Sequence, residues 1–494
     1  MNRLLLTALF VAGSLPAHIG HSAPAAGSHE AQAVAAIEGL GGQVERAGPE
    51  GPVVKVVLKG AEIGDETLEL VAKLTALREL YLTETEVTDL GLRQITRLAA
   101  LETLEVSDAP ISDAALEQIA RLPRLVKLDL NYSPVSDNGL AHLPRLTRLE
   151  SLNLWHTRVT QAGLAHLVGL ANLHTLDLTD TAVTGDGLAE LARLAGLQTL
   201  ELGFTPIRNA DLARLKGLTG LRALSLPGTQ VSDLGLEHLV ELSNLKTLNL
   251  GETRVTDAGM EHVAKLAKLE VLDLFATRVG DVGLALLADE LEDLVTLNLR
   301  GTDVTDLGLA YLPAMSRLWT LNLAHTGVTD EGLEVLRPLA DLETLGLWNT
   351  SVTDAGMAAI AAHTKLARLD LGETRVTDAA LQRLAGMAEL RSLVLAGTQV
   401  GDLGLAHVAK LPALQLLTLN RTQITDEGLR QLRGLSHLRT LHLAGTGITD
   451  QGLALLEPLA ELRELGLQRT HVTEAGVARL QQALPTLRIA KGGQ

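Results

Sequence analysis

The sequence of 494 residues contains no cysteine. That absence excludes disulfide bonds, thiolate catalysis, zinc sites with cysteine ligands and lipid attachment to an N-terminal cysteine. Aromatic residues are also scarce, since three Trp, three Tyr and three Phe make up only 2% of a chain that is 46% hydrophobic. The core must therefore be built from leucine, valine and alanine, and its stability must come from packing.

An excess of basic charge is missing as well. The chain has 59 Asp and Glu against 42 Lys and Arg, for a formal net charge of -17. Binding to a polyphosphate needs clustered Lys and Arg, so we expect no nucleic-acid partner.

Long uncharged apolar runs are absent except at the N-terminus, where one extends from Leu4 to Leu15. This run is too short to span a bilayer, for which about 20 residues are needed. Arg3 precedes it, and small residues and prolines follow through Ala26, which is typical of a secretory signal peptide. We expect a signal peptide over residues 1–25 and a soluble exported protein, secreted or periplasmic, with no transmembrane segment.

The segment that follows predicts an N-terminal cap over residues 26–52. Apolar spacing between Ser28 and Arg46 predicts a short amphipathic helix that is ended by Gly41 and Gly42. Glycines and prolines at 48–52 then indicate a turn, and Val53 to Leu58 predicts the first strand.

Beyond this point the chain repeats every 24 residues. One position, which we call the threonine column, holds Ala61, Thr85, Ala109, Ser133, Thr157, Thr181, Thr205, Thr229, Thr253, Thr277, Thr302, Thr326, Thr350, Thr374, Thr398, Thr422, Thr446 and Thr470. Thr302 comes one residue late, and we expect the extra residue to form a bulge in the helical half of the preceding unit, in LALLADELEDL. The series makes eighteen units.

A regular unit is LKTLNLGETRVTDAGMEHVAKL, which starts at Leu245. Its first part alternates with period two and predicts a strand, whereas its second part has apolar spacing of three and predicts a helix capped by Thr256 or Asp257. Core positions are Leu248, Leu250, Val255, Met260 and Val263. We expect the threonine column to satisfy backbone groups at the turn that leaves each strand, from one unit to the next, which is a structural role.

No unit can bury its own leucine face, so successive units must stack. The predicted fold is an α/β solenoid over residues 53–483, a curved right-handed superhelix with a parallel sheet on the concave face and helices on the convex face. Residues 484–494 would form a C-terminal cap and tail.

The motif L-x-x-L-x-L-x-x-T-x-V-T-D-x-G-L resembles the leucine-rich-repeat family from about Val53 to Ile489. It is most similar to the ribonuclease-inhibitor-like and cysteine-containing repeats, with Thr in place of the usual Asn or Cys. The short N-terminal cap and the tail at Ala483 to Ile489 resemble secreted bacterial members. Cysteine-containing repeats imply an F-box ubiquitin-ligase receptor, but no F-box precedes the repeats and the signal peptide contradicts that role.

Aromatic residues concentrate where the predicted strands face the concave surface. Six of the eight that follow the signal peptide occupy three outward positions per unit: Tyr81, Tyr132, Trp155, Phe204, Phe275 and Trp348. Aromatic side chains serve as anchors in interfaces. The alternative is that a tight leucine core leaves them no other place. We predict a ligand-binding surface centred on Tyr132, Trp155 and Phe204.

A polar column lies between the two inner leucines of each strand. It includes Glu105, Asp129, Asn153, Asp177, Glu201, Asn249, Asp273, Asn298, Asn322 and Asp370. We expect Glu105, Asp129, Asp177 and Glu201 to contribute to ligand binding, by meeting a basic partner, a sugar or a calcium ion. The alternative is a solvated strand face. Towards the C-terminus the concave positions become basic at Arg300, Arg368, Arg421 and Arg469.

Histidines recur at one helical position, in His142, His166, His238, His262 and His407, but other units place Gln, Glu, Arg or Tyr there, as an exposed face would. We expect no metal site there and no cofactor. Ser, His and Asp belong to repeat columns, and none stands out as a nucleophile with its own base. We therefore expect no catalytic residue and no enzyme.

The sequence predicts a monomeric, non-catalytic protein that binds a protein, or a polysaccharide, through its concave face. The first alternative is a structural envelope or spacer protein without a discrete ligand. The second is the ubiquitin-ligase-type receptor, which needs a cytosolic location.

Overall fold

A computed structural model describes residues 29–491 of the chain. The predicted signal peptide, residues 1–25, lies outside the described residues. The first described element is helix α1 (His29–Gly39), which buries Ala33, Val34 and Ile37 and ends before Gly41 and Gly42. An antiparallel pair of strands, which the sequence did not suggest, follows this helix: β1 (Gln43–Arg46) pairs with β2 (Val53–Lys59).

Every predicted repeat contributes one short strand to a single sheet. From β2 to β20 each strand is parallel to the next, and equivalent leucines are paired, as Leu248 is with Leu272. The remaining strands are β3 (Glu79–Thr83), β4 (Thr103–Ser107), β5 (Lys127–Asp129), β6 (Ser151–Asn153), β7 (Thr175–Asp177), β8 (Thr199–Glu201), β9 (Ala223–Ser225), β10 (Thr247–Asn249), β11 (Val271–Asp273), β12 (Thr296–Asn298), β13 (Thr320–Asn322), β14 (Thr344–Gly346), β15 (Arg368–Asp370), β16 (Ser392–Val394), β17 (Leu416–Thr418), β18 (Thr440–His442), β19 (Glu464–Gly466) and β20 (Arg488–Ala490).

Each strand is followed by a short helix on the opposite side. The α-helices are α2 (Asp65–Val71), α3 (Asp89–Ile95), α4 (Asp113–Ile119), α5 (Asp137–Leu140), α6 (Gln161–Leu164), α7 (Gly185–Leu191), α8 (Asn209–Leu212), α9 (Asp233–Leu236), α10 (Asp257–Val263), α11 (Asp281–Ala288), α12 (Asp306–Leu309), α13 (Asp330–Val335), α14 (Met357–Ile360), α15 (Asp378–Leu384), α16 (Asp402–Val408), α17 (Asp426–Leu429), α18 (Asp450–Ala454) and α19 (Glu474–Ala483). Short 3-10 segments are η1 (Leu143–Arg145), η2 (Ala165–Gly169), η3 (Ala213–Gly217), η4 (Glu237–Leu239), η5 (Leu312–Ala314), η6 (Asp354–Gly356) and η7 (Arg430–Gly434).

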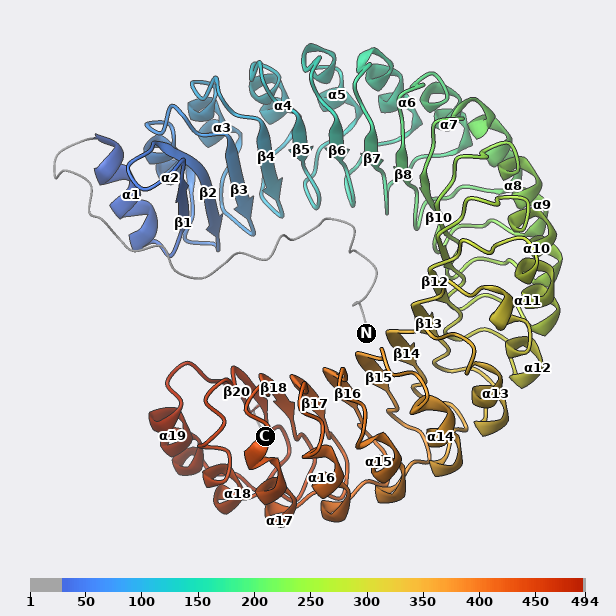
Figure 1. Cartoon of the computed structure of the whole chain (residues 1–494). Helices are drawn as coiled ribbons and strands as arrows, with labels where there is room; N and C mark the ends of the chain where they lie inside the picture. The colour runs from blue at the N-terminus through green and yellow to red at the C-terminus, as the bar shows by residue number, and fades with distance from the viewer. Residues whose placement is uncertain (1–28, 492–494) are drawn as a thin grey trace.

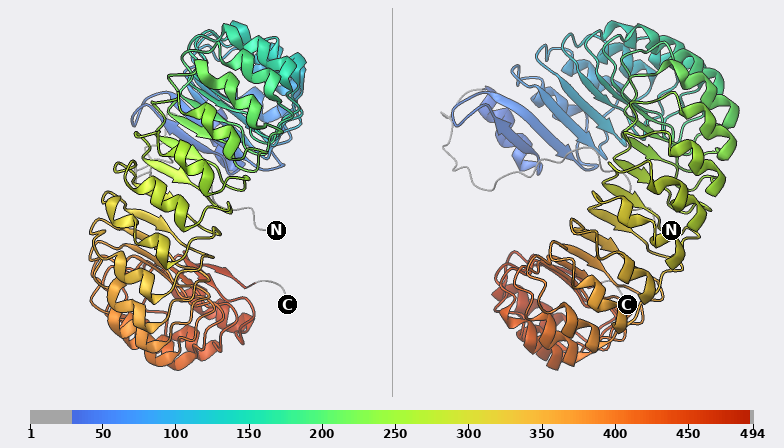
Figure 2. Two further views of the ribbon diagram at one scale, coloured as in Figure 1. Left: turned by 90° about the vertical axis from the view of Figure 1, so that its right-hand side faces the viewer. Right: turned by 45° about the vertical axis from the view of Figure 1, so that its right-hand side comes forward.

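Because the helices are wider than the strands, stacked units splay on the helical side and the sheet curves inward. Figure 1 shows the resulting open arc, with the strands on the inner face and the helices on the outer face. The views in Figure 2 show that the arc is also twisted, so that its two limbs do not lie in one plane. The predicted solenoid is confirmed.

The interior is a continuous leucine core that passes from unit to unit. The five predicted core residues Leu248, Leu250, Val255, Met260 and Val263 are at most 1% exposed. The extra residue before Thr302 is absorbed in α11, which has eight residues where α10 has seven. Strands β11 and β12 stay in register across it, since Val271 pairs with Thr296.

The threonine column satisfies backbone carbonyl groups at the turn that leaves each strand, as expected. Apart from Thr85, each hydroxyl of the column donates within its own unit, to the carbonyl oxygen three residues earlier, as Thr157 does to Leu154 at 2.7 Å. These bonds stay within one unit and do not join it to the next. The reason is that the residue is buried beneath the turn that leaves the strand, where the nearest free acceptor is the last strand carbonyl of the same unit.

The bonds between units come instead from the first residue of each helix. Asp233 accepts from both the backbone N–H and the hydroxyl of Thr256, each at 2.8 Å, while the Thr256 hydroxyl caps its own helix by accepting from Ala258. We call this pair of bonds the aspartate clamp. The clamp carboxylate also explains a glycine, because a Cβ on Gly259 would lie 2.6 Å from an oxygen of Asp233.

The clamp recurs along the solenoid. Both bonds join Asp65 to Thr88, Asp89 to Ser112, Asp113 to Ser136, Asp137 to Thr160, Asp233 to Thr256, Asp281 to Thr305, Asp306 to Thr329, Asp330 to Thr353, Asp354 to Thr377, Asp402 to Thr425, Asp426 to Thr449 and Asp450 to Thr473. Asn209 and Ser232 form an amide version. Gly280 and Gly401, which lack a hydroxyl, keep only the bond from N–H.

Two neighbouring joints within residues 29–491 lack the clamp. Gln161 stands where Asp is expected and makes no hydrogen bond to Thr184, and Gly185 has no side chain to offer to Arg208. The N–H of Arg208 instead donates to Asp211 of its own helix at 2.9 Å. The unit between β7 and β8 is therefore attached to both neighbours mainly by the sheet and the core.

Candidate functional site

The residue immediately before the threonine column has a left-handed backbone in unit after unit. We call this position the αL column. Its non-glycine members, all with φ between 50° and 58°, are Glu84, Asp108, Tyr132, His156, Asp180, Phe204, Glu252, Ala276, His325, Asn349, Glu373, Arg421 and Arg469, and its glycines, which also have positive φ values, are Gly60, Gly228, Gly301, Gly397 and Gly445. A left-handed conformation costs roughly 1–2 kcal/mol for a residue with a Cβ, and bulky residues there are genuine outliers. Tyr132 and Phe204 are thus held in an unfavourable conformation.

Tyr132 and Trp155 lie against each other on neighbouring units. Their ring centroids are 4.8 Å apart in an edge-to-face arrangement, and the ring of His156 lies 4.6 Å from that of Tyr132. His156 Nδ1 is in turn 2.7 Å from a carboxylate oxygen of Asp180. The structure therefore brings together four side chains, which we call the aromatic cluster: Tyr132, Trp155, His156 and Asp180.

Phe204 lies apart from this cluster. It is 52% exposed, and its ring covers Gly228 of the next unit, where a Cβ would collide with it. The unit between Trp155 and Phe204 places Thr179 and Asp180 at the equivalent positions. The expected apolar strip is therefore interrupted by a polar unit, and Phe204 forms a second, isolated ring on the same face.

The other three predicted anchors are spread along the arc. Tyr81 donates a hydrogen bond to Glu79 at 3.0 Å and lies beneath the Lys55 ammonium, 4.9 Å from its ring centre. Burial, together with Glu79, raises the pKa of Tyr81 to about 12.

Phe275 and Trp348 belong to later units. The guanidinium of Arg300 lies 5.4 Å from the ring centre of Phe275, and the Trp348 ring lies against Gly372. All three anchors are half-buried, so they contribute isolated apolar contacts.

Most side chains of the polar column accept hydrogen bonds from backbone N–H groups. Asp177, Asn249 and Asp370 each accept from the N–H two residues further on, at 2.8 to 2.9 Å. The column continues in the same way at Asp129, Asn153, Asp273, Asn298 and Asn322. These side chains satisfy backbone N–H groups of the turn that leaves each strand, so most of the column has a structural role.

Two glutamates of the column accept hydrogen bonds from side-chain hydroxyls instead. Glu105 accepts from the hydroxyls of Thr83 and Ser107, each at 3.0 Å, and Glu201 is hydrogen-bonded to Ser225. Of the four predicted binding carboxylates, none is left without an internal partner.

Burial raises the pKa values of several carboxyl groups of the polar column. Desolvation raises the pKa of Asp129 to about 6, although hydrogen bonds from Asn131 and Asn153 act in the opposite direction. Desolvation also raises the pKa values of Asp177, Glu201, Asp273 and Asp370. Within residues 29–491, no group of three or more His, Asp or Glu is spaced to hold a metal ion.

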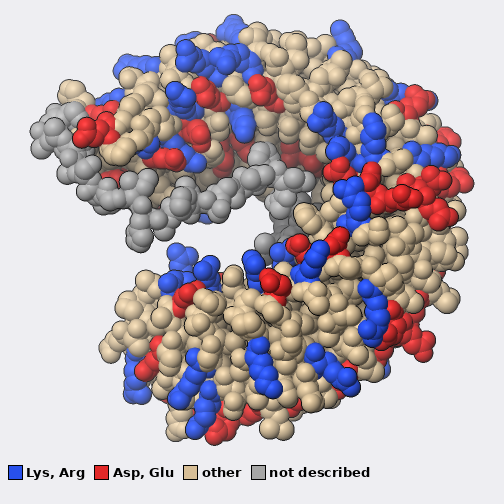
Figure 3. Space-filling model, viewed as in Figure 1, with Lys and Arg blue, Asp and Glu red and all other residues tan. Residues whose placement is uncertain are grey.

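Charge is unevenly distributed around the arc. Figure 3 shows acidic side chains along the inner edge of the N-terminal limb and basic side chains along that of the C-terminal limb. Arg421 and Arg469 belong to the αL column of the C-terminal units, and Arg421 pairs with Glu373 two units earlier. Arg300 and Arg368 lie in the strand region of the same limb.

Sequence reasoning missed His156 and Asp180. Both belong to the αL column, whose residues do not differ in type from those at other exposed positions of the repeat. The backbone angle distinguishes this column. Of the two aromatics outside the concave positions, Tyr311 is 46% exposed and Trp319 is 49% exposed.

None of the described helices combines the length and the apolarity that crossing a bilayer requires.

Comparisons with known proteins agree with this architecture. Residues 169–192, 241–264, 318–336 and 434–456 match the family model described as a leucine-rich repeat. No curated protein matches the sequence. Among solved structures, a chain of the mouse RP105/MD-1 complex is 19% identical, with 84% of this chain and 78% of that chain covered and a TM-score of 0.52.

Two bacterial structures are also similar. An internalin of Listeria monocytogenes is 23% identical, with 74% of this chain and 94% of that chain covered and a TM-score of 0.45. A leucine-rich-repeat protein of Leptospira interrogans is 20% identical, with 80% and 91% covered and a TM-score of 0.46. Similarity at this level concerns the fold alone.

Proposed function

Because this chain is a leucine-rich-repeat protein, we propose that it is an exported, non-catalytic protein that binds a protein partner on its concave face, centred on the aromatic cluster. Repeat proteins of this kind present an extended concave surface and generally act as binding scaffolds. The ribonuclease-inhibitor-like subtype of the repeats and the exported state remain part of this proposal.

The observation that carries the proposal is the conformation of Tyr132. Its φ of 54° is unfavourable for an aromatic residue, and five other units place glycine in this column. Strain of this kind persists where the surrounding structure imposes it, and it concentrates at binding sites. Tyr132 is also the residue on which Trp155 and His156 converge.

The chemistry of the cluster suits a protein surface. The rings of Tyr132 and Trp155 offer apolar area at little cost in side-chain entropy, while His156 and Asp180 provide hydrogen bonds at its edge. Phe204 would make a second contact further along the same face. The spacer alternative predicts instead that no confined set of concave residues contributes to partner binding.

The test compares two triple variants of the mature chain as bait for proteins of the producing cell's surface and surroundings. Tyr132→Gly, Trp155→Ala and Phe204→Gly remove the anchors, and Ala276→Gly, Ala324→Gly and Asn349→Gly are the control at positions of the same columns. We expect the parent and the control to retain the same partner. The anchor variant should bind it more weakly by about 2 kcal/mol per anchor, the usual scale of a hot spot.

Two results would contradict the proposal. If the anchor variant binds the partner as well as the parent does, recognition lies elsewhere. If neither the parent nor the control retains any partner, and substitutions along the whole concave face leave the behaviour of the protein unchanged, the spacer alternative is favoured.

A further inference from the structure

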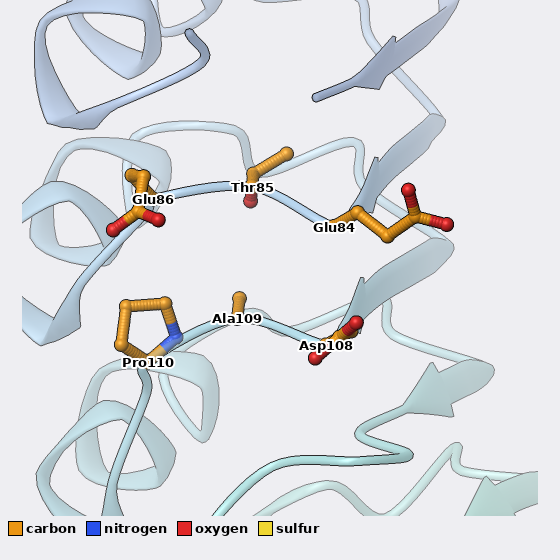
Figure 4. A pocket seen from close by; sticks show the side chains of 6 residues that line it. All are labelled: Glu84, Thr85, Glu86, Asp108, Ala109 and Pro110. Carbon is orange, nitrogen blue, oxygen red and sulfur yellow. The ribbon is translucent and has the colours of Figure 1, made fainter. Parts of the chain in front are cut away.

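A cavity of about 400 Å³ opens between two loops of the N-terminal limb, in the units that precede Tyr132 of the aromatic cluster. Glu84, Thr85 and Glu86 line one side, and Asp108, Ala109 and Pro110 line the other. In Figure 4 these loops run side by side where strands β3 and β4 end, with the Thr85 hydroxyl and the Ala109 methyl group facing each other across the gap.

The cavity exists because the threonine column is interrupted here. Ala109 replaces the usual threonine, so that both a hydroxyl and a methyl group are missing between the loops. Neighbouring Thr85 is 2% exposed, and its Oγ1 has no hydrogen-bond partner among the described residues. A buried hydroxyl without a partner costs roughly 1–3 kcal/mol. This unsatisfied group faces the cavity.

The rim of the cavity is strongly acidic. Glu84, Glu86 and Asp108 are all exposed, and only Glu84 has a compensating partner, Lys59 at 2.9 Å. Residues 61–108 contain eleven Asp and Glu but only four Lys and Arg. A second cavity of about 480 Å³ shares Glu86 and adds the carboxylates of Glu62, Asp65 and Glu66.

These features define the chemistry of an occupant. The carboxylates of Glu84, Glu86 and Asp108 are spread along the rim, so they suit a cation that can reach widely spaced acceptors. An ammonium or guanidinium group on a flexible chain does so, because it carries three or five N–H donors. Such a donor would also satisfy the Thr85 oxygen.

We propose that the cavity between Glu84–Glu86 and Asp108–Pro110 binds the cationic end of a lysine or arginine side chain from a basic partner segment. The charged group donates to Glu86, Asp108 and the Thr85 hydroxyl, and the space left by Ala109 admits it. This site adjoins the concave face, since Asp108 directly precedes Tyr132 in the αL column, but it does not depend on the function proposed for the aromatic cluster.

The test measures binding of a fluorescein-labelled peptide, Gly-Arg-Gly-Arg-Gly, by fluorescence anisotropy at low ionic strength with the full mature chain. The double variant Glu86→Gln with Asp108→Asn removes two charges from the rim. Its matched control, Glu252→Gln with Asp303→Asn, removes two unpaired exposed carboxylates from the equivalent positions of later units. We expect about a tenfold loss of affinity in the first variant and less than about a twofold loss in the control.

Ala109→Thr fills the cavity without changing the charge. The introduced hydroxyl should donate to the carbonyl oxygen of Val106, as in other units, so that the variant melts no lower than the parent while peptide binding falls about tenfold. Thr85→Val removes the unsatisfied hydroxyl at constant shape, so it should weaken peptide binding while the variant melts at or above the temperature of the parent.

Three outcomes would overturn the proposal. Equal losses in the rim variant and in its control would mean that only the overall charge matters. Unchanged binding by the folded Ala109→Thr variant would mean that the cavity is not entered. Equal binding of the peptide with citrulline in place of arginine would mean that no cation is recognised. A lysine version that binds like the arginine version would support the shared chemistry of the two cations.

Discussion

At the scale of single residues, the αL column separates two kinds of side chain that look alike in the sequence. Gly228, Gly301, Gly397 and Gly445 adopt φ values near 70° without a steric cost, whereas Tyr132 and Phe204 adopt similar values against one. An aromatic residue at this position keeps its ring exposed at a cost in backbone stability.

Phe204→Gly should leave the melting temperature unchanged or raise it slightly. The substitution removes a left-handed cost of about 1 kcal/mol and loses little packing, although glycine has more chain entropy to lose on folding. Leu202→Ala, two residues earlier in the buried core, should instead cost about 2–5 kcal/mol. Thermal melts of both variants provide the check. A Phe204→Gly variant that melts as low as Leu202→Ala would mean that the ring is structural.

Asp129→Asn should stabilise the protein at pH 7.5 and have little effect at pH 4. The pKa of Asp129 is raised from its usual 3.8 to about 6 by burial. Its stabilising contribution is therefore complete below pH 4 and is lost as the pH rises through 6, because the buried carboxylate must then ionise. We expect a gain of about 1–2 kcal/mol at pH 7.5, measured by denaturant unfolding at both pH values. An amide fits, since Asn298 and Asn322 are neighbours in the same column.

Asp450→Asn provides the control of opposite sign. Hydrogen bonds from Thr473 lower the pKa of Asp450, so its contribution is present above the usual pKa of an aspartate and disappears only as the pH falls through the lowered value. The variant should be destabilised at pH 7.5. A gain for both variants at that pH would show that net charge, rather than burial, controls the effect.

At the scale of elements, the unclamped joint at Gln161 gives a direct test of the aspartate clamp. Gln161→Asp should place a carboxylate within reach of the N–H and hydroxyl of Thr184 and add about 1 kcal/mol. Ala162→Asp introduces the same charge one residue later in the same first turn but cannot reach Thr184, so it controls for the helix dipole. Hydrogen exchange at the Thr184 amide should slow only in the first variant. Equal slowing in both would remove the clamp as the cause.

Much of this element-level description could be predicted from the sequence, because strand and helix periods are local. The alternation around Leu248 and Leu250 and the spacing to Met260 were sufficient to place the core. What connects two units was not predictable in this way. Asp257 looked like a cap for its own helix, yet its carboxylate accepts from Gly280 of the next one. Spacing along one chain does not show towards which neighbour a side chain turns.

The candidate site was predictable to a similar extent. Spacing placed Tyr132 and Trp155 on adjacent strands, and their rings do meet. It could not show that Asp180 pairs with His156, or that the intervening unit separates Phe204 from the cluster, because both depend on side-chain directions at a turn. The antiparallel strand β1 was missed since Gln43–Arg46 is too short and too polar to stand out.

At the scale of the whole molecule, export is the prediction that remains to be checked. The mature chain should begin between residues 18 and 30, because small residues follow the apolar run of Leu4 to Leu15. N-terminal sequencing of the protein recovered outside the cytoplasm measures this directly. A cytosolic protein that retains Met1 would contradict both the signal peptide and the proposed site of action.

The two unclamped joints have a mechanical consequence for the arc. Units stacked in a line carry the same tension, and the joint with the fewest bonds across it extends the furthest. Those joints lie on either side of the unit that holds Asp180, between Trp155 and Phe204. A load on the two ends of the arc would therefore first change the distance between the Trp155 and Phe204 rings. The clamped units on both sides would move as rigid bodies.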